Sequence, residues 1–224
     1  MTGTVKIAID GPSGSGKSTL ARSLSKILGY VYVDTGAIYR TVGLYAKRNG
    51  ISPDDEKSLK ERFPDINISL KWENGCQRIL LNGEDVSEDI RTPEASMYAS
   101  AVSALPEVRK FLLSMQRDIA ARSNVIMDGR DIGTVILPDA QVKIFMHAEA
   151  KIRAERRYKE LVGKGKDVTY KEVYDDMCRR DKNDSTREQA PCIPAKDAVI
   201  FDNSLLSETE TVERALKIIE EKIK

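Results

Sequence analysis

The sequence is poor in the residues that build disulfide frameworks, zinc sites and membrane spans. It has three cysteines, Cys76, Cys178 and Cys192, with no C-x-x-C pair among them, and a single histidine. An odd number of widely spaced thiols argues against a disulfide framework, and the missing C-x-x-C pair together with the single histidine argues against a zinc site. No run of about eighteen apolar residues occurs, so no segment is predicted to span a membrane.

An excess of charge of one sign is also missing. The 36 Lys and Arg residues nearly balance the 35 Asp and Glu residues, which leaves a net charge of +1. This balance argues against a polyanion-binding surface as the main activity. The first expected strand begins so early that no room remains for a signal peptide. We therefore expect a soluble cytoplasmic protein with neither nucleic acid nor membrane as a partner. As a separate expectation, we take it to be a monomer.

What the sequence does contain is a phosphate-binding motif near its N-terminus. The run Gly11-Pro12-Ser13-Gly14-Ser15-Gly16-Lys17-Ser18, followed by Thr19, fits the P-loop pattern G-x-x-x-x-G-K-[ST]. Its glycines let backbone N–H groups turn inward around an anion, Lys17 can neutralise the β- and γ-phosphates, and the Ser18 hydroxyl can ligate Mg²⁺. Residues 5–9 read as a buried strand and residues 18–28 as a helix, which is the context that the motif requires. This context favours a nucleoside triphosphate site over a glycine-rich turn without function.

Four further apolar runs, at residues 30–33, 125–127, 142–146 and 198–201, alternate with helical patterns. Such alternation predicts an α/β fold with a five-stranded parallel sheet and helices on both faces. Asp34, Asp128 and Asp202 each follow one of these runs. Ligands of open parallel sheets bind beyond the carboxyl ends of the strands, so these positions are candidates for function.

Two segments depart from this alternation. Within residues 64–90, apolar and polar residues alternate around the turn signals Asn74-Gly75 and Asn82-Gly83, which predicts an inserted antiparallel β meander. An inert decoration is an open alternative for this insert. Two charged helices, at about 149–162 and 169–182, flank a loop at Lys164-Gly165-Lys166 and form a candidate lid.

Two motifs at strand ends carry candidate ligands for a second phosphate. In Asp34-Thr35-Gly36-Ala37-Ile38-Tyr39-Arg40, the planar fork of Arg40 suits bidentate pairing with a phosphate, and a surface salt bridge is the alternative. In the 128–133 loop, Arg130 and Asp131 lie between glycines, which suits close approach to a ligand. A structural turn with an internal ion pair is the alternative there.

Arginines are concentrated in the candidate lid. Arg153, Arg156 and Arg157 share one helical face, where Glu149 and Glu160 could pair with Arg153 and Arg156 as a solvated salt-bridged surface. The other interpretation is that a closing lid delivers cations to the phosphoryl group in flight and excludes water. On that interpretation we expect Arg156 and Arg157 to contact ATP.

Together these motifs resemble bacterial cytidylate kinases, members of the nucleoside-monophosphate kinase family of P-loop proteins. The P-loop, the 34–40 and 129–133 motifs, and Arg180-Asp181 with Asp184 and Arg187 follow the family's order and spacing nearly end to end. The resemblance implies a P-loop core at 1–34, 103–148 and 191–224. It also implies an acceptor domain at 35–102 with the β insert, and a helical lid at 149–190.

The resemblance further implies transfer of the ATP γ-phosphoryl group to CMP or dCMP, with Mg²⁺. It assigns residues 11–19 to the ATP phosphates, and Thr35, Arg40 and Arg130 to the acceptor phosphate. It assigns Ser100, Arg109 and Asp131 to the cytosine, and Arg180, Asp184 and Arg187 to contacts with sugar and phosphate from the lid. The catalytic charges would be those of Lys17, Arg130, Arg180 and Arg187.

Two other functions remain open from the sequence. A kinase of the same fold could act on another nucleotide or a metabolite. A P-loop GTPase or nucleotide-sensing regulator is less favoured, because the chain has no [NT]-K-x-D motif for reading guanine and carries its arginines in cis.

Overall fold

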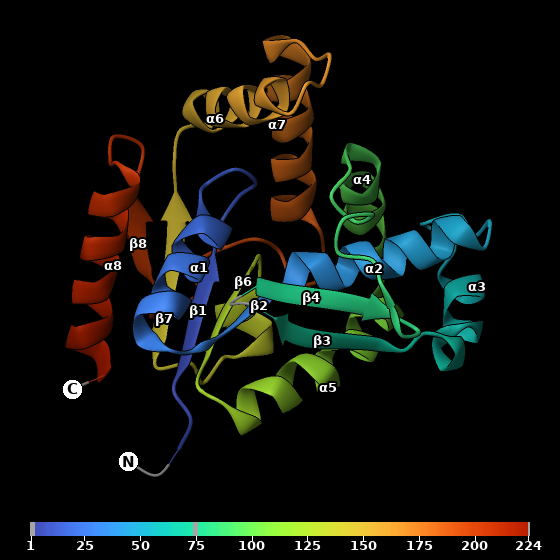
Figure 1. The fold of residues 1–224 in the computed structure, drawn as a ribbon, viewed down its shortest axis with the longest axis horizontal. Coiled ribbons are helices and arrows are strands. Elements are labelled where there is room, and N and C mark those ends of the chain that lie inside the picture. The colour runs from blue at the N-terminus through green and yellow to red at the C-terminus, as the bar shows by residue number, and fades with distance from the viewer. Residues whose placement is uncertain (1–2, 74–75, 224) are drawn as a thin grey trace. The chain divides into compact units, whose positions relative to one another are not determined.

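The computed structural model describes residues 3–73 and 76–223, shown as a ribbon in Figure 1. The chain divides into two compact units. The first comprises Met1–Val31 and Ser123–Lys224, and the second comprises Tyr32–Arg122. We refer to them as the P-loop unit and the acceptor unit, and describe each by itself.

The fold is organised by a five-stranded sheet. Its strands are β1 (Lys6–Asp10), β2 (Val31–Asp34), β6 (Val125–Gly129), β7 (Val142–His147) and β8 (Val199–Asp202), in the order β2-β6-β1-β7-β8. Strand β1 pairs in parallel with β6 on one side and with β7 on the other, and β7 pairs in parallel with β8. Ile7, Ala8 and Ile9 are fully buried. The prediction of a five-stranded parallel sheet is confirmed, and each observed strand overlaps its predicted run.

Two helices of the P-loop unit pack on this sheet and on each other. Helix α1 (Lys17–Leu28) lies against β1 and β6, and helix α8 (Glu208–Ile223) lies against β7. Leu20 and Leu24 of α1 are buried, as the apolar face of residues 18–28 predicts. A short π-helix, η2 (Ile132–Ile136), follows β6 and lies against β1.

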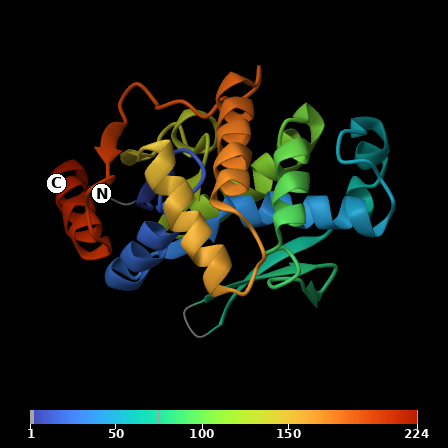
Figure 2. The ribbon, with the colours of Figure 1, turned by 90° about the horizontal axis from the view of Figure 1, so that it is seen from above.

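The lid of the P-loop unit is a pair of helices, α6 (Ala150–Gly163) and α7 (Tyr170–Thr186), which lie side by side in Figure 2. Ala154, Val173 and Met177 form their buried contact. A capping box of Thr169 and Glu172 starts α7 at the predicted place. The helix continues beyond the predicted end at 182 to Thr186, because no glycine or proline intervenes. The Ser185 and Thr186 hydroxyls donate to the Lys182 carbonyl.

The acceptor unit contains five helical segments and a small antiparallel sheet. The helical segments are α2 (Thr35–Arg48), α3 (Glu56–Glu61), η1 (Phe63–Asp65), α4 (Pro93–Val102) and α5 (Pro106–Arg122). The sheet consists of β3 (Ile68–Glu73), β4 (Cys76–Leu81) and β5 (Glu84–Asp85), in that order.

This sheet confirms the predicted antiparallel meander. Its second turn has positive φ at both Asn82 and Gly83, the conformation that a type I′ turn requires. The first predicted turn, Asn74-Gly75, lies outside the described residues. Across residues 3–73 and 76–223, every helix is too short or too polar to cross a bilayer.

Gly43 in α2 provides a test of helix packing in the acceptor unit. A Cβ at this position would lie 2.8 Å from Cβ of Tyr98 and 3.3 Å from the backbone N of Ala99, both in α4. Helix propensity alone predicts that Gly→Ala stabilises by about 1 kcal/mol. We expect the steric overlap to win, so that Gly43→Ala lowers the free energy of unfolding by about 1–3 kcal/mol.

The matched control is Gly163→Ala at the end of α6, where a Cβ would meet nothing within 4 Å. This variant should be neutral or slightly stabilising in chemical denaturation. Equal effects of the two substitutions would contradict the packing argument.

Candidate functional site

The P-loop connects β1 to α1 and leaves the start of α1 open. Gly16 occupies the N-cap in a left-handed conformation, no side chain caps the helix, and its first turn contains no acidic residue. Within the described residues, no side chain therefore caps the first backbone N–H groups, which is what an anion site at a helix N-terminus requires. At Gly11, a Cβ would lie 2.2 Å from the Met146 carbonyl oxygen of β7, so only glycine lets the loop pass this strand.

Lys17, the P-loop lysine, is buried within the loop. Its Nζ donates to the Pro12 carbonyl at 2.6 Å and to Ser15 Oγ at 3.3 Å. Burial, followed by the positive charge of Arg130, lowers the pKa of Lys17 to about 7. The lysine is thus held where its charge is costly, and a nearby phosphate would restore its ordinary protonation.

The Ser18 hydroxyl meets a carboxylate at the end of a neighbouring strand. Its Oγ donates to Asp128 Oδ2 at 2.7 Å, and Asp128 is the penultimate residue of β6. The sequence places Asp128 at a strand end but does not identify it as a partner of Ser18. This pair supplies two oxygen groups of the kind that Mg²⁺ prefers.

Asp10, at the end of β1, is a buried acid that the sequence analysis missed. Its two carboxylate oxygens accept from the backbone N–H groups of Ile132 and Gly133, at 2.7 and 2.8 Å. Burial raises the pKa of Asp10 to about 6, although the two N–H groups act in the opposite direction. The carboxylate fixes the start of η2, directly after Arg130 and Asp131.

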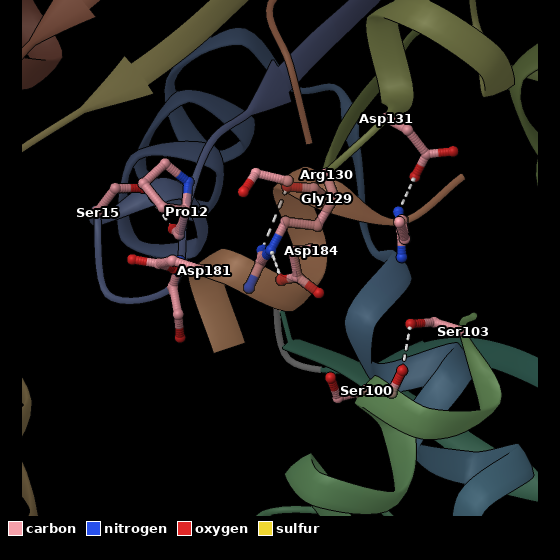
Figure 3. A network of polar contacts seen from close by, with 12 residues as sticks. Pro12, Ser15, Ser100, Ser103, Gly129, Arg130, Asp131, Asp181 and Asp184 are labelled. Atoms are coloured by element: carbon pink, nitrogen blue, oxygen red, sulfur yellow. Dashed lines mark hydrogen bonds and ion pairs between the residues drawn. The ribbon is translucent and has the colours of Figure 1, made fainter. Parts of the chain in front are cut away.

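Arg130, Arg180 and Arg187 of the P-loop unit lie near the carboxylates of Asp131 and Asp184. Figure 3 labels Arg130 and both acids. Arg130 Nε donates to Asp184 Oδ2 at 2.8 Å, and Arg187 Nη2 lies 3.6 Å from Asp131 Oδ1. Burial alone would lower the pKa of Arg130, but the adjacent Asp184 carboxylate raises it above its ordinary value. Burial and then the charge of Arg130 lower the pKa of Arg180, whose buried Nε has no hydrogen-bond partner.

The arginines of α6 have partners different from those expected for a salt-bridged face. Arg153 pairs with Asp181 of α7 at 2.6 Å rather than with Glu149. Arg156 Nη2 donates to the Asn203 carbonyl at 2.9 Å rather than to Glu160, which is paired with Arg157. The alternative of a salt-bridged face is therefore present in the Arg157–Glu160 pair, but not with the partners considered for Arg153 and Arg156.

Asn203 is a further residue that the sequence did not reveal. It follows β8, and its Nδ2 donates to the Ser15 carbonyl at 3.1 Å. The same Nδ2 would lie 3.3 Å from a Cβ at Gly16, so Asn203 supports the P-loop next to this glycine. Its buried Oδ1 has no hydrogen-bond partner. The preceding residue, Asp202 at the end of β8, accepts a hydrogen bond from the backbone N–H of Ser204, two positions further along the chain.

In the acceptor unit, Arg40 forms the salt bridge that was considered as the alternative to phosphate binding. Its Nη2 pairs with Asp34 Oδ2 at 2.9 Å, and Asp34 also caps α2 by accepting from the Ala37 N–H. The structure therefore contains an ion pair between Arg40 and Asp34. The Arg40 Nε is nevertheless buried without a hydrogen-bond partner, and Thr35 is buried at the first position of α2. The Nε edge of the guanidinium thus has an N–H donor available for an anion.

The structure brings together two of the predicted base-reading residues. Arg109 Nη1 donates to the Ser103 carbonyl at 3.2 Å, and Ser103 Oγ donates to the Ser100 carbonyl at 3.0 Å. The Arg109 guanidinium also lies over the Tyr39 ring, 5.6 Å from its centroid. The third predicted residue, Asp131, belongs to the P-loop unit and is described there.

Comparison with known proteins identifies the family that these features belong to. The sequence model of the cytidylate kinase family matches residues 7–221. A cytidylate kinase of Caldicellulosiruptor bescii is 49% identical over 98% of this chain and 97% of its own. A cytidylate kinase of Caldanaerobacter subterraneus subsp. tengcongensis is also 49% identical, over 99% of this chain and 97% of its own.

Among solved structures, an uncharacterized protein from Eubacterium ventriosum matches with a TM-score of 0.54 and 15% identity. The match covers 97% of this chain and 99% of the other. A likeness at this identity concerns the fold alone.

The raised pKa of Asp10 predicts a specific pH dependence of stability. The folded protein keeps the Asp10 proton up to about pH 6, whereas an unfolded aspartate loses it near 3.8. Because the folded state then binds more protons, the contribution of Asp10 to the free energy of unfolding falls as the pH rises between these values. The fall should be on the order of 2 kcal/mol.

Asp10→Asn removes this titration. We expect the free energy of unfolding of the wild type to fall relative to that of the variant as the pH rises from about 4 to 6.5. Denaturant unfolding of both proteins across this range measures the difference. Parallel curves would contradict it.

Proposed function

Because the chain belongs to the cytidylate kinase family, we propose that it transfers the γ-phosphoryl group of ATP to CMP or dCMP, giving ADP and CDP or dCDP. The observation that carries the proposal is the concentration of positive charge beside the P-loop. Burial and then the charge of Arg130 lower the pKa of both Lys17 and Arg180, so each of these two cations lies within electrostatic reach of Arg130. Such a cluster attracts the negatively charged phosphates of nucleotide substrates.

The donor would bind at the P-loop. The N–H groups at the start of α1 would donate hydrogen bonds to the phosphate oxygens. Lys17 would give up its hydrogen bond to the Pro12 carbonyl and bind the β- and γ-phosphates instead. Residues 11–19 supply this cradle. From the lid, Arg156 is the better placed of the two predicted arginines to meet ATP, because its present partners are only backbone carbonyls next to β8.

The Ser18 and Asp128 oxygens fit a divalent cation, since they approach within 2.7 Å at the P-loop. We propose that these two residues hold Mg²⁺ together with the ATP phosphates. When bound, the cation would neutralise charge on the β- and γ-phosphates.

The acceptor would need no protein nucleophile, because its phosphate oxygen is already an anion at neutral pH. Thr35 and Arg40 would hold this phosphate through the Thr35 hydroxyl and the Arg40 Nε, with Arg130 contributing from the P-loop unit. Ser100, Arg109 and Asp131 would read the cytosine. Catalysis then consists of positioning and of stabilising the charge that spreads over the transferred phosphoryl group.

The lid arginines would contribute to this stabilisation. Arg180 Nε is buried without a hydrogen-bond partner, so it has a donor available for a phosphate oxygen. Asp184 orients Arg130, and Asp131 lies beside Arg187, which keeps both guanidinium groups near the reaction. We further propose domain limits of 1–34, 103–148 and 191–224 for the core, 35–102 for the acceptor domain and 149–190 for the lid. A monomer in the cytoplasm with no nucleic-acid partner completes the proposal.

A screen of nucleoside monophosphates with ATP and Mg²⁺, which monitors ADP release, tests this function. CMP and dCMP should be the preferred acceptors, and Lys17→Met should lower turnover by a factor of roughly 10²–10³ without unfolding the protein. Turnover of another acceptor with CMP ignored would indicate a different kinase of the same fold. Nucleotide binding without transfer to any acceptor would indicate a regulator.

Asp131 allows a test of base recognition. Cytosine presents an amino donor at N4, whereas uracil presents an O4 acceptor and an N3–H donor. An ionised carboxylate only accepts, so Asp131 favours cytosine, and Asp131→Asn offers an N–H to O4. We expect the CMP/UMP ratio of kcat/KM to fall about tenfold or more in this variant.

Asp184→Asn is the matched control, because it removes a second buried carboxylate that pairs with an arginine. It should lower kcat/KM for CMP and UMP by similar factors. If Asp131→Asn also affects the two acceptors equally, Asp131 serves only to hold Arg187.

A further inference from the structure

Ser13 of the P-loop is held on both sides by an ion pair of the lid helices. The Arg153 Nη1 in the first turn of α6 donates to the Ser13 carbonyl at 2.7 Å. Asp181 Oδ1 of α7 accepts from the Ser13 N–H at 3.2 Å. The same Arg153 and Asp181 side chains meet each other at 2.6 Å. Both backbone polar groups of one P-loop residue are thus bound by two side chains that also bind each other.

The surroundings of this pair differ from those of an ordinary surface salt bridge. Arg153 is only 5% exposed, and its Nε donates to the Ala148 carbonyl at 2.8 Å, so its donors are directed at backbone oxygens and one carboxylate. The adjacent Gly14 also fits against the lid, since a Cβ there would lie 2.7 Å from Met177 Cε and 3.4 Å from Arg153 Cβ. Figure 3 shows Asp181 next to the P-loop residues Pro12 and Ser15.

We propose that Arg153 and Asp181 are positioning residues for the ATP site, which fix the Ser13 peptide so that the P-loop is preformed for the donor phosphates. This proposal rests on the proposed kinase function. The conformation of a nest depends on the direction of each N–H group, and two charge-assisted hydrogen bonds on one residue determine that direction. Arg153 also neutralises the carboxylate, which would otherwise place a bare negative charge beside the site of a polyphosphate.

The pair also connects the lid to the donor site. Arg153 belongs to α6 and Asp181 to α7, so the ion pair crosses the helical hairpin and both ends reach the same loop residue. Asp181 lies next to Arg180 in sequence, and three positions before Asp184, which holds Arg130. A change in Asp181 therefore acts on the donor side directly and on the proposed acceptor side only through α7.

Asp181→Asn is the most informative variant. It keeps an oxygen that can accept from Ser13 N–H but removes the charge, and it leaves Arg153 with its two carbonyl partners, so the protein should fold. We expect KM for ATP to rise about tenfold, the order expected for weakening one charge-assisted interaction, and KM for CMP to change by less than about twofold. The dissociation constant of a non-hydrolysable ATP analogue, measured by calorimetry, should rise by a similar factor.

Asp175→Asn on the same helix is the matched control, because Asp175 forms an exposed ion pair with Lys171 and does not touch the P-loop. It should leave both KM values and the melting temperature unchanged. The double variant Arg153→Met with Asp181→Asn should raise KM for ATP no more than Arg153→Met alone, since the two side chains act as a unit.

Three results would overturn the proposal. An unchanged KM for ATP in Asp181→Asn would mean that the carboxylate does not position the loop. A lower KM would mean that it repels the donor phosphates. Equal rises for ATP and CMP together with a lower melting temperature would mean that the pair only stabilises the lid. A protein that turns over no nucleoside monophosphate would fail the proposed function instead, and binding of the ATP analogue would still test the role of Asp181.

Discussion

Positive charge confined in a poorly solvated place is the constraint on which the site depends. Lys17 and Arg180 both have lowered pKa values, through burial and then through the nearby Arg130. A folded chain tolerates such a cluster only if carboxylates offset part of it, and Asp184 does so at 2.8 Å from Arg130. This compensation is partial, since the pKa values of Lys17 and Arg180 stay lowered, and phosphates of the substrates are the remaining partners that we propose.

The backbone around this cluster is held from three directions. Asn203 binds the Ser15 carbonyl from the end of β8, Asp10 binds the start of η2 from the end of β1, and the pair of Arg153 and Asp181 binds Ser13 from the lid. None of these groups was assigned a contact with a phosphate. Their common effect is to fix the loops that carry the assigned residues, which reduces the reorganisation needed when charge develops in the transition state.

Features encoded by neighbouring residues were predictable from the sequence, and features that depend on distant partners were not. The P-loop, the five strands, the Asn82-Gly83 turn and the start of α7 follow from local patterns. Asp10 was missed because its partner N–H groups lie 122 and 123 positions away. For Arg153, the alternative partner considered from the sequence lies one helical turn away, whereas its actual partner, Asp181, belongs to the next helix, which only tertiary packing reveals. The roles of the assigned residues toward bound nucleotides remain predictions.

The central place of β1 has a consequence for how the molecule comes apart. This strand is paired on both edges, and Ile7, Ala8 and Ile9 are fully buried, whereas α7 contributes few buried side chains. Local opening removes the least buried elements first, and strands paired on both sides open only with the whole domain. We therefore expect partially unfolded forms in which the lid helices α6 and α7 have detached and β1 is still in place. Such forms keep the support that Asp10 and Asn203 give to the loops and lose the support that Arg153 and Asp181 give to Ser13.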